Sequence, residues 1–290
     1  MHEKQLDKDT IFQTSGFVDI HSHILPGLDD GPVNLDQSLE AIKRYEALGF
    51  GCIIATPHWI PATRWASSPE VIIKKVNEIN SILQQKNISM TILPGMEIAF
   101  SDQLYDNITS SICLPLDLKD FFLIEFPLSP SISGVSDHFL TKLTADKRLK
   151  FIVAHPERCP VFLNNENLLH KLVRLGMLVQ VNINSILGGY GKKIQKTSFN
   201  FLRAGLVHFL ATDSHARADR TPPNNNQWKK LFDIMGEEGI RNAFDTNPRQ
   251  MLAGKEVRPL AMNEMNFEQS YRAGAGKDLF NTFRKLFNRV

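Results

Sequence analysis

The residues of this 290-residue chain that could do chemistry are histidines and carboxylates, and they recur where short apolar runs end. His21 and His23 follow the run FVDI, His58 follows CIIATP, and His155 follows FIVA. Imidazole and carboxylate groups at such positions can bind divalent cations. The complete set of candidate metal ligands is His21, His23, Asp30, His58, Glu97, Glu125, His155, Asp213 and His215.

These candidates are more informative together than singly. A histidine near a strand end is more often a hydrogen-bonded structural group than a metal ligand. Glu125 fits that alternative poorly, because a carboxylate inside FFLIEF is costly to bury unless it is paired or bound to metal. Nine ligands exceed what one ion can use, so the sequence predicts a cluster of two or three ions. A ligand set without thiolates suits Mn²⁺, Fe²⁺ or Zn²⁺.

Two arginines lie close to the last two of these histidines. Arg158 comes three residues after His155, and Arg220 comes five residues after His215. A guanidinium group binds phosphate oxygens in a fork and keeps its charge, so both arginines are candidate catalytic residues that bind a phosphoryl group. Arg217 is a weaker candidate. The alternative for each arginine is a surface ion pair.

Seven apolar runs, and the helical patterns between them, must position these side chains. The runs are rich in Val, Ile and Phe and lie at 17–20, 52–56, 90–94, 121–126, 151–154, 177–183 and 207–212. Between them lie helical patterns such as Leu35, Leu39 and Ile42, followed by a stop at Gly49. This alternation predicts a parallel α/β fold, either a barrel or an open sheet. The lack of a glycine-rich phosphate motif favours the barrel, in which the strand ends converge on one face.

The segment 59–70 (WIPATRWASSPE) follows one of these strand ends and contains two tryptophans. Its composition is typical of a turn-rich connection. It is either a loop over the site or an ordinary surface turn.

Composition argues against several other functions. The formal net charge is +2, and the tail at 271–290 alone carries +4, which leaves −2 for the rest of the chain. A body without net positive charge does not favour nucleic acid as a partner. Three cysteines without a pairing pattern suit a reducing cytosol, and no apolar segment approaches the ~20 residues of a membrane span. We therefore expect a soluble, cytoplasmic protein.

Phosphatase chemistry that depends on a cysteine nucleophile is also disfavoured. It would need an arginine six residues after the nucleophile, but the positions six after Cys52, Cys113 and Cys159 hold His58, Lys119 and Asn165. The sequence therefore excludes that chemistry.

The motifs resemble those of the polymerase and histidinol phosphatase (PHP) superfamily. The stretches that carry the resemblance are DIHSHILPGLDDG (19–31), ATPH (55–58), GMEI (95–98), LIEF (123–126), AHPER (154–158), QVN (180–182) and ATDSH (211–215). Within the superfamily they are most similar to bacterial protein-tyrosine phosphatases of the CpsB/YwqE type, which are associated with capsule and exopolysaccharide biosynthesis. The resemblance runs from about Phe17 to Leu252 and covers most of the chain.

This resemblance implies a distorted (β/α)7 barrel of the PHP type whose metal cluster, usually manganese, serves to hydrolyse phosphotyrosine. The implied mechanism is attack by metal-activated hydroxide without a covalent phosphoenzyme. The nine candidate ligands all match the family pattern, with Asp30 as the second aspartate of the DDG turn. Arg158 matches the arginine of AHPER, and Arg220 matches the arginine before the proline pair. The implied partner is a tyrosine-phosphorylated kinase of a polysaccharide-export system.

Other functions stay open at this point. One is a small-molecule phosphatase of the histidinol phosphatase kind, and another is a PHP-type phosphodiesterase or exonuclease. A third is a metal-binding regulatory module of a polysaccharide-export system that does not turn over substrate. The DDG turn and AHPER favour the tyrosine phosphatase, and the complete ligand set favours an enzyme over a module.

We expect three segments: an N-terminal extension at 1–16, the phosphatase barrel at 17–260, and a basic C-terminal tail at 261–290. In the tail, the apolar residues Phe280, Phe283, Leu286 and Phe287 recur at the spacing of an amphipathic helix. Docking of this helix against the barrel, contact with another subunit in a homo-oligomer, and contact with an acidic partner are the alternatives. Binding to a membrane surface would need more basic charge or a second anchor.

Overall fold

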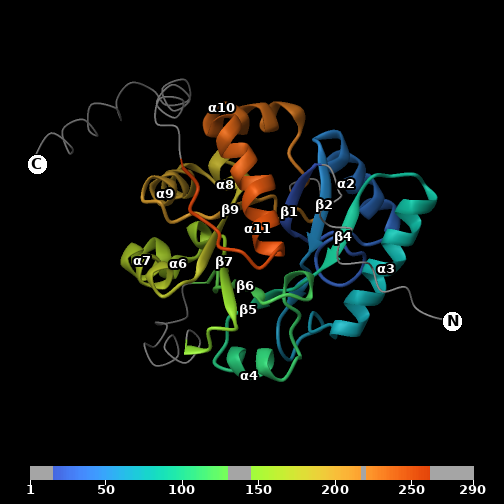
Figure 1. The fold of residues 1–290 in the computed structure, drawn as a ribbon, viewed down its shortest axis with the longest axis horizontal. Coiled ribbons are helices and arrows are strands. Elements are labelled where there is room, and N and C mark those ends of the chain that lie inside the picture. The colour runs from blue at the N-terminus through green and yellow to red at the C-terminus, as the bar shows by residue number, and fades with distance from the viewer. Residues whose placement is uncertain (1–15, 130–144, 217–219, 262–290) are drawn as a thin grey trace, which may run out of the picture.

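The computed structural model describes residues 16–129, 145–216 and 220–261, and it shows a mixed α/β fold (Figure 1). Its strands are β1 (Phe17–Ser22), β2 (Phe50–Ala55), β3 (His58–Trp59), β4 (Thr91–Pro94), β5 (Glu97–Ala99), β6 (Phe121–Glu125), β7 (Lys150–Ala154), β8 (Leu178–Asn182) and β9 (Phe209–Ala211). The predicted tail helix, Arg217 and residues 1–15 of the predicted N-terminal extension lie outside the described residues.

Helices follow most of the strands. The α-helices are α2 (Leu35–Ala47), α3 (Pro69–Gln85), α4 (Leu104–Thr109), α6 (Pro160–Leu163), α7 (Glu166–Arg174), α8 (Ile183–Leu187), α9 (Lys192–Arg203), α10 (Asn225–Arg241) and α11 (Asn247–Leu252). Short turns of helix are η1 (Leu116–Leu118), η2 (Pro156–Arg158) and η3 (Asn242–Thr246). Figure 1 shows the strands in the middle of the molecule, with α2 and α3 on one side and α6, α7 and α9 on the other.

The described strands pair in parallel around a ring. β1 pairs with β2 and β2 with β4. After a short break, β3 continues β2 and pairs with β5, which continues β4. From β5 the pairing runs through β6, β7 and β8 to β9. A bridge between Ser22 and Ser214 then joins the chain after β9 to β1, and His23 N donates to Ser214 O at 2.8 Å. With each interrupted strand taken once, seven strands of the described chain close the ring, in agreement with the predicted distorted (β/α)7 barrel.

All seven apolar runs form strands, and the helical pattern of Leu35, Leu39 and Ile42 forms α2. The sequence did not predict β3 and β5, which are two and three residues long. It also set the boundaries of one loop too widely, because Trp59 is buried in β3 and Pro69 begins α3. Asn34 caps the start of helix α2, and its side chain accepts a hydrogen bond from Gln37 N.

Two layers of apolar side chains hold the fold together. Alternate residues of the strands, such as Val18, Ile54 and Leu123, form one buried cluster. Their neighbours on the same strands, such as Ile53 and Ile124, pack with the helices in a second and larger cluster. The first cluster therefore fills the inside of the ring, and the second lies between the strands and the helices.

A β-bulge in β1 brings the first histidine pair to the inside of the ring. Between Asp19 and Ser22 the strand has one more residue than the facing part of β2. Asp19 and Ser22 both bond to the Tyr45 hydroxyl of α2, at 2.8 and 3.0 Å, and therefore face outward. Ile20 belongs to the inner cluster, and the bulge lets His21 follow it on the same side.

In the described part of the chain, no helix is both long enough and apolar enough to cross a membrane.

Candidate metal centre

The structure brings all nine candidate ligands together at the end of the ring where the strands finish. They form four overlapping groups whose ligand atoms lie within 4.8 Å of one another. The groups are His23, Asp30, His58 and His215; His21, Glu97 and His155; His21, His23 and Asp213; and His58, Glu97 and Glu125. Several residues belong to two groups, which is the arrangement that ligands shared between neighbouring ions require.

Glu97, at the start of β5, is the centre of this arrangement. Its Oε1 lies 2.8 Å from His155 Nε2 and 3.3 Å from His21 Nε2. Its Oε2 lies 2.9 Å from His58 Nδ1 and 3.2 Å from His23 Nε2. Burial alone would raise the pKa of Glu97, but the surrounding imidazoles hold it well below its usual range. A buried carboxylate in contact with four imidazoles is suited to bridge two cations.

Two observations show that the residues fit divalent cations. Burial and the neighbouring charge of Glu97 raise the pKa of Glu125 to about 7, so that these carboxylates need a cation to be ionised together. His58 Nδ1 and Glu97 Oε2 are buried and make no hydrogen bond within the described chain, although they lie 2.9 Å apart. Buried polar atoms without a hydrogen bond are costly, and coordination to a cation would remove that cost.

Two of the candidate ligands have backbones in the left-handed region. His155 has φ +30° and directly follows β7. Asp213 has φ +51° and is the second residue after β9. Non-glycine residues rarely adopt this conformation, which costs energy and is concentrated at functional sites. The strained backbone turns both side chains into the cluster.

The DDG turn contributes a second aspartate whose role the sequence did not predict. Asp29 Oδ2 lies 2.6 Å from His23 Nδ1 and accepts a hydrogen bond from His58 N at 2.9 Å. Gly31 is required in this turn, because a Cβ there would lie 2.5 Å from His23 O. Asp29 therefore orients the His23 ring directly and holds His58 through the backbone N–H of His58. Asp30 is the aspartate of this pair that lies among the ligand groups.

Arg158 and Arg220 both contact Asp213. Arg158 Nη1 donates to Asp213 Oδ2 at 2.7 Å, and Arg220 Nη2 donates to both carboxylate oxygens at 2.8 and 2.9 Å. These are not surface ion pairs, because the Asp213 side chain is fully buried and the arginine side chains are 14% and 19% exposed. The Arg158 guanidinium also lies over the Tyr190 ring, 4.7 Å from its centre. Both arginines thus lie beside the ligand cluster.

The loop after β3 covers one face of the cluster. Trp65 stacks on His58 with ring centres 5.3 Å apart and planes inclined by 15°. Of the two interpretations of this segment, the structure therefore supports a loop over the site.

Glu157, in the same motif as Arg158, is buried behind the cluster. It accepts hydrogen bonds from Asn182 N at 3.0 Å and from the Ser185 hydroxyl at 2.6 Å. Both bonds go to Oε1, and Oε2 makes none within the described chain. Burial raises the pKa of Glu157 to about 7, despite these two donors.

This raised pKa predicts how stability depends on pH. Between about pH 4.5 and 7 the folded protein keeps a proton on Glu157 that the unfolded chain has lost. The associated stability is present below pH ~4.5 and is lost as the pH rises through ~7, by at most about 3 kcal/mol. Glu157→Gln keeps the accepting oxygen and removes the titration. We expect urea denaturation from about pH 5 to 8 to show a flatter profile for the variant. Parallel profiles would contradict the buried, protonated state.

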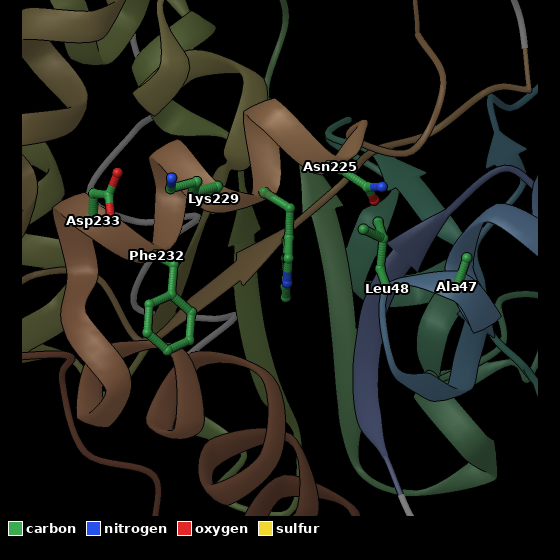
Figure 2. Close-up of a pocket in the computed structure, with 7 residues that line it drawn as sticks. Ala47, Leu48, Asn225, Lys229, Phe232 and Asp233 are labelled. Atoms are coloured by element: carbon green, nitrogen blue, oxygen red, sulfur yellow. The ribbon is translucent and has the colours of Figure 1, made fainter.

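A surface pocket of about 470 Å³ lies elsewhere, between α2 and α10 (Figure 2). It is lined by Ala47, Leu48, Asn225, Trp228, Lys229, Phe232 and Asp233. None of the candidate ligands lines it, so this pocket is separate from the metal centre.

Comparison with known proteins gives consistent results. The family profile for capsular polysaccharide synthesis, CpsB/CapC, matches residues 17–253. The putative tyrosine-protein phosphatase CapC of Staphylococcus aureus is 32% identical over 203 residues, which are 70% of this chain and 78% of that protein. The tyrosine-protein phosphatase YwqE of Bacillus subtilis (strain 168) is 32% identical over 204 residues, covering 68% of this chain and 77% of YwqE.

The fold has a solved counterpart. One chain from the crystal structures of YwqE from Bacillus subtilis and CpsB from Streptococcus pneumoniae matches with a TM-score of 0.74 and 26% identity. The match covers 85% of this chain and 99% of that chain, and those proteins are described as unique metal-dependent tyrosine phosphatases.

Proposed function

The chain belongs to the CpsB/CapC family, and from this premise we propose that it is a metal-dependent protein-tyrosine phosphatase. The observation that carries the proposal is the convergence of nine imidazole and carboxylate ligands around the buried Glu97. Relatives of this chain are named as tyrosine phosphatases, which supports the same reaction for this chain.

We assign the nine ligands to a cluster of two or three divalent ions, with manganese as the first choice and iron or zinc as alternatives. When bound, such ions lower the pKa of water toward neutrality and stabilise developing negative charge. The nine residues of this chain would hold the ions and orient one another around them. Arg158 and Arg220, beside Asp213, are positioned to bind phosphoryl oxygens with the guanidinium N–H groups that do not point at Asp213.

The test is a comparison of substrates with metal-stripped and metal-loaded protein. We expect release of phosphate from a phosphotyrosine peptide by the Mn²⁺-loaded protein, loss of activity after chelation, and recovery when Mn²⁺ is restored. Preferential turnover of histidinol phosphate would favour the small-molecule phosphatase, and turnover of a nucleic-acid end would favour a nuclease. If the metal-loaded protein released phosphate from no ester, the regulatory module would be the better explanation.

The physiological substrate we propose is the phosphorylated tyrosine of a polysaccharide-export kinase. This rests on the family's description as proteins of capsular polysaccharide synthesis and on the relatives' names. We place the enzyme in the cytoplasm, which agrees with three cysteines that are all buried and unpaired.

We also propose the barrel at 17–260 as the catalytic unit and predict that the tail is dispensable for catalysis. All nine candidate ligands precede residue 260. Near the end of the described residues, Leu260 N donates a hydrogen bond to Val207 O at 2.7 Å, which attaches this segment to the barrel. Deleting residues 266–290 should leave the metal content unchanged and kcat/KM within about twofold of the full chain. Loss of metal or activity would show that the tail belongs to the catalytic core. Light scattering on both proteins would reveal whether the tail joins subunits.

A further inference from the structure

The QVN motif on β8 has no part in the function described so far, yet its two amides lie against the cluster. Gln180 and Asn182 are fully buried, in a strand whose neighbouring residues Val179 and Val181 pack outward with the helices. Elsewhere around the ring the inward positions are mostly apolar, and Ile152 and Ala154 on the adjacent β7 are examples. Buried amides need hydrogen-bond partners, and these two find them among the ligands.

The amides form a continuous chain of hydrogen bonds between two candidate ligands. His21 Nδ1 lies 3.0 Å from Gln180 Oε1. Gln180 Nε2 donates to Asn182 Oδ1 at 2.8 Å, and Asn182 Nδ2 donates to Asp213 Oδ2 at 2.8 Å. Asn182 is also fixed through its backbone, because its N–H donates to Glu157 Oε1 at 3.0 Å.

Asp213 determines which group donates and which accepts in each of these hydrogen bonds. Its carboxylate receives hydrogen bonds from Arg158 and Arg220, so its oxygens can only accept. Asn182 must therefore present its NH2 group to Asp213 and its oxygen to Gln180. Gln180 must then present its own NH2 group to Asn182 and its oxygen to the imidazole.

At the end of this series of hydrogen bonds, Gln180 Oε1 is an acceptor that faces His21 Nδ1. That nitrogen must carry the proton, which leaves the lone pair on Nε2. Nε2 is the atom that faces the cluster, 3.3 Å from Glu97 Oε1 and 3.6 Å from Asp213 Oδ1. His23 gets the same tautomer directly from a carboxylate, because its Nδ1 lies 2.6 Å from Asp29 Oδ2.

We propose that Gln180 and Asn182 are positioning residues, which transmit the hydrogen-bond polarity of Asp213 to His21 and so fix the tautomer in which His21 can bind metal. The proposal rests on the metal site assigned above but not on the identity of the substrate. Partners behind metal-binding histidines typically change metal affinity by 10–100-fold when they are removed.

The test reads the tautomer itself in the full-length protein. Long-range ¹H–¹⁵N correlation spectra of metal-stripped protein, at a pH where the imidazoles are neutral, report which nitrogen of His21 carries the proton. We expect Nδ1–H alone in the wild type. Gln180→Met removes the acceptor at nearly the same volume, and Asn182→Leu breaks the chain at a residue that does not touch His21. Both variants should show a mixture that includes Nε2–H.

The second measurement is the affinity for Mn²⁺ by titration calorimetry. We expect the dissociation constant to rise by about 10–100-fold in both variants. The matched control is Gln195→Met, which makes the same substitution at a residue of α9 that donates to Ile186 O at 2.8 Å, and it should change neither measurement.

Nε2–H in the wild type would overturn the proposal without any variant, even if Asn182→Leu did not fold. A single Nδ1–H tautomer and unchanged Mn²⁺ affinity in a folded Asn182→Leu protein would also overturn it. Neither readout uses a phosphate ester. If the protein kept the Nδ1–H tautomer of His21 but hydrolysed no phosphotyrosine, the proposed function would be refuted, but the role of Gln180 and Asn182 would not.

Discussion

Replacing Glu97 by glutamine should lower kcat/KM for a phosphotyrosine peptide by at least about 10³-fold, or about 4 kcal/mol of transition-state stabilisation. Glutamine keeps the size of the side chain but removes its charge and turns one oxygen into a donor. That donor would lie among imidazole nitrogens, 2.8 Å from His155 Nε2 or 2.9 Å from His58 Nδ1. We expect elemental analysis to show that the variant loses metal together with activity, because the Glu97 carboxylate contacts four of the imidazoles.

Glu237→Gln is the matched control for this experiment. Glu237 has a 75% exposed side chain and pairs with Arg241 four residues later in α10. The same chemical change there should leave both metal content and kcat/KM as they are in the wild type. Glu97→Gln protein that retained a full complement of metal and near-normal turnover would show that the carboxylate is not a bridging ligand.

The strands and the meeting of the candidate ligands at one site could be predicted from the sequence, because both follow from local rules. Strands buried on two sides are continuous apolar runs, so FVDI or FIVA stands out without any alignment. Parallel strands end on one face of a barrel, so residues that follow these runs must meet there. His21 and His155 could therefore be assigned to one site although 134 positions separate them along the chain.

What the sequence could not supply depends on contacts between distant elements. The bulge in β1 is a mismatch of one residue with β2, so it exists only in the paired strands. Asp29 and Asp30 are chemically identical neighbours, and only the turn at Gly31 separates their roles. Gln180 and Asn182 are uncharged, and their importance appears only when Asp213 and His21 are placed at either end. The QVN motif was the available signal, but nothing in its residues indicated a role.

The spacing of the two arginines from the histidines identified them in the sequence, but it did not show that both pair with Asp213. This pairing predicts that removing either arginine affects the binding of metal and the binding of phosphate in opposite ways. Arg158→Ala or Arg220→Ala removes a positive charge beside the carboxylate of Asp213, a candidate ligand, with contacts of 2.7 and 2.8 Å. The carboxylate that remains is at least as attractive to a cation, so Mn²⁺ affinity should stay the same or increase. A phosphoryl dianion loses a charged donor, so kcat/KM should fall by about 10–100-fold, and inhibition by inorganic phosphate should weaken.

Arg148→Ala is the control, because Arg148 has an 87% exposed side chain and pairs with Asp146 outside the site. It should leave Mn²⁺ affinity, kcat/KM and phosphate inhibition unchanged. Calorimetry with Mn²⁺ and steady-state kinetics with added phosphate measure the two sides of the prediction on the same protein. If the variants of Arg158 or Arg220 lost Mn²⁺ in parallel with activity, the arginines would act by holding Asp213 in place. If metal and kinetics were both unchanged, neither arginine would touch the substrate.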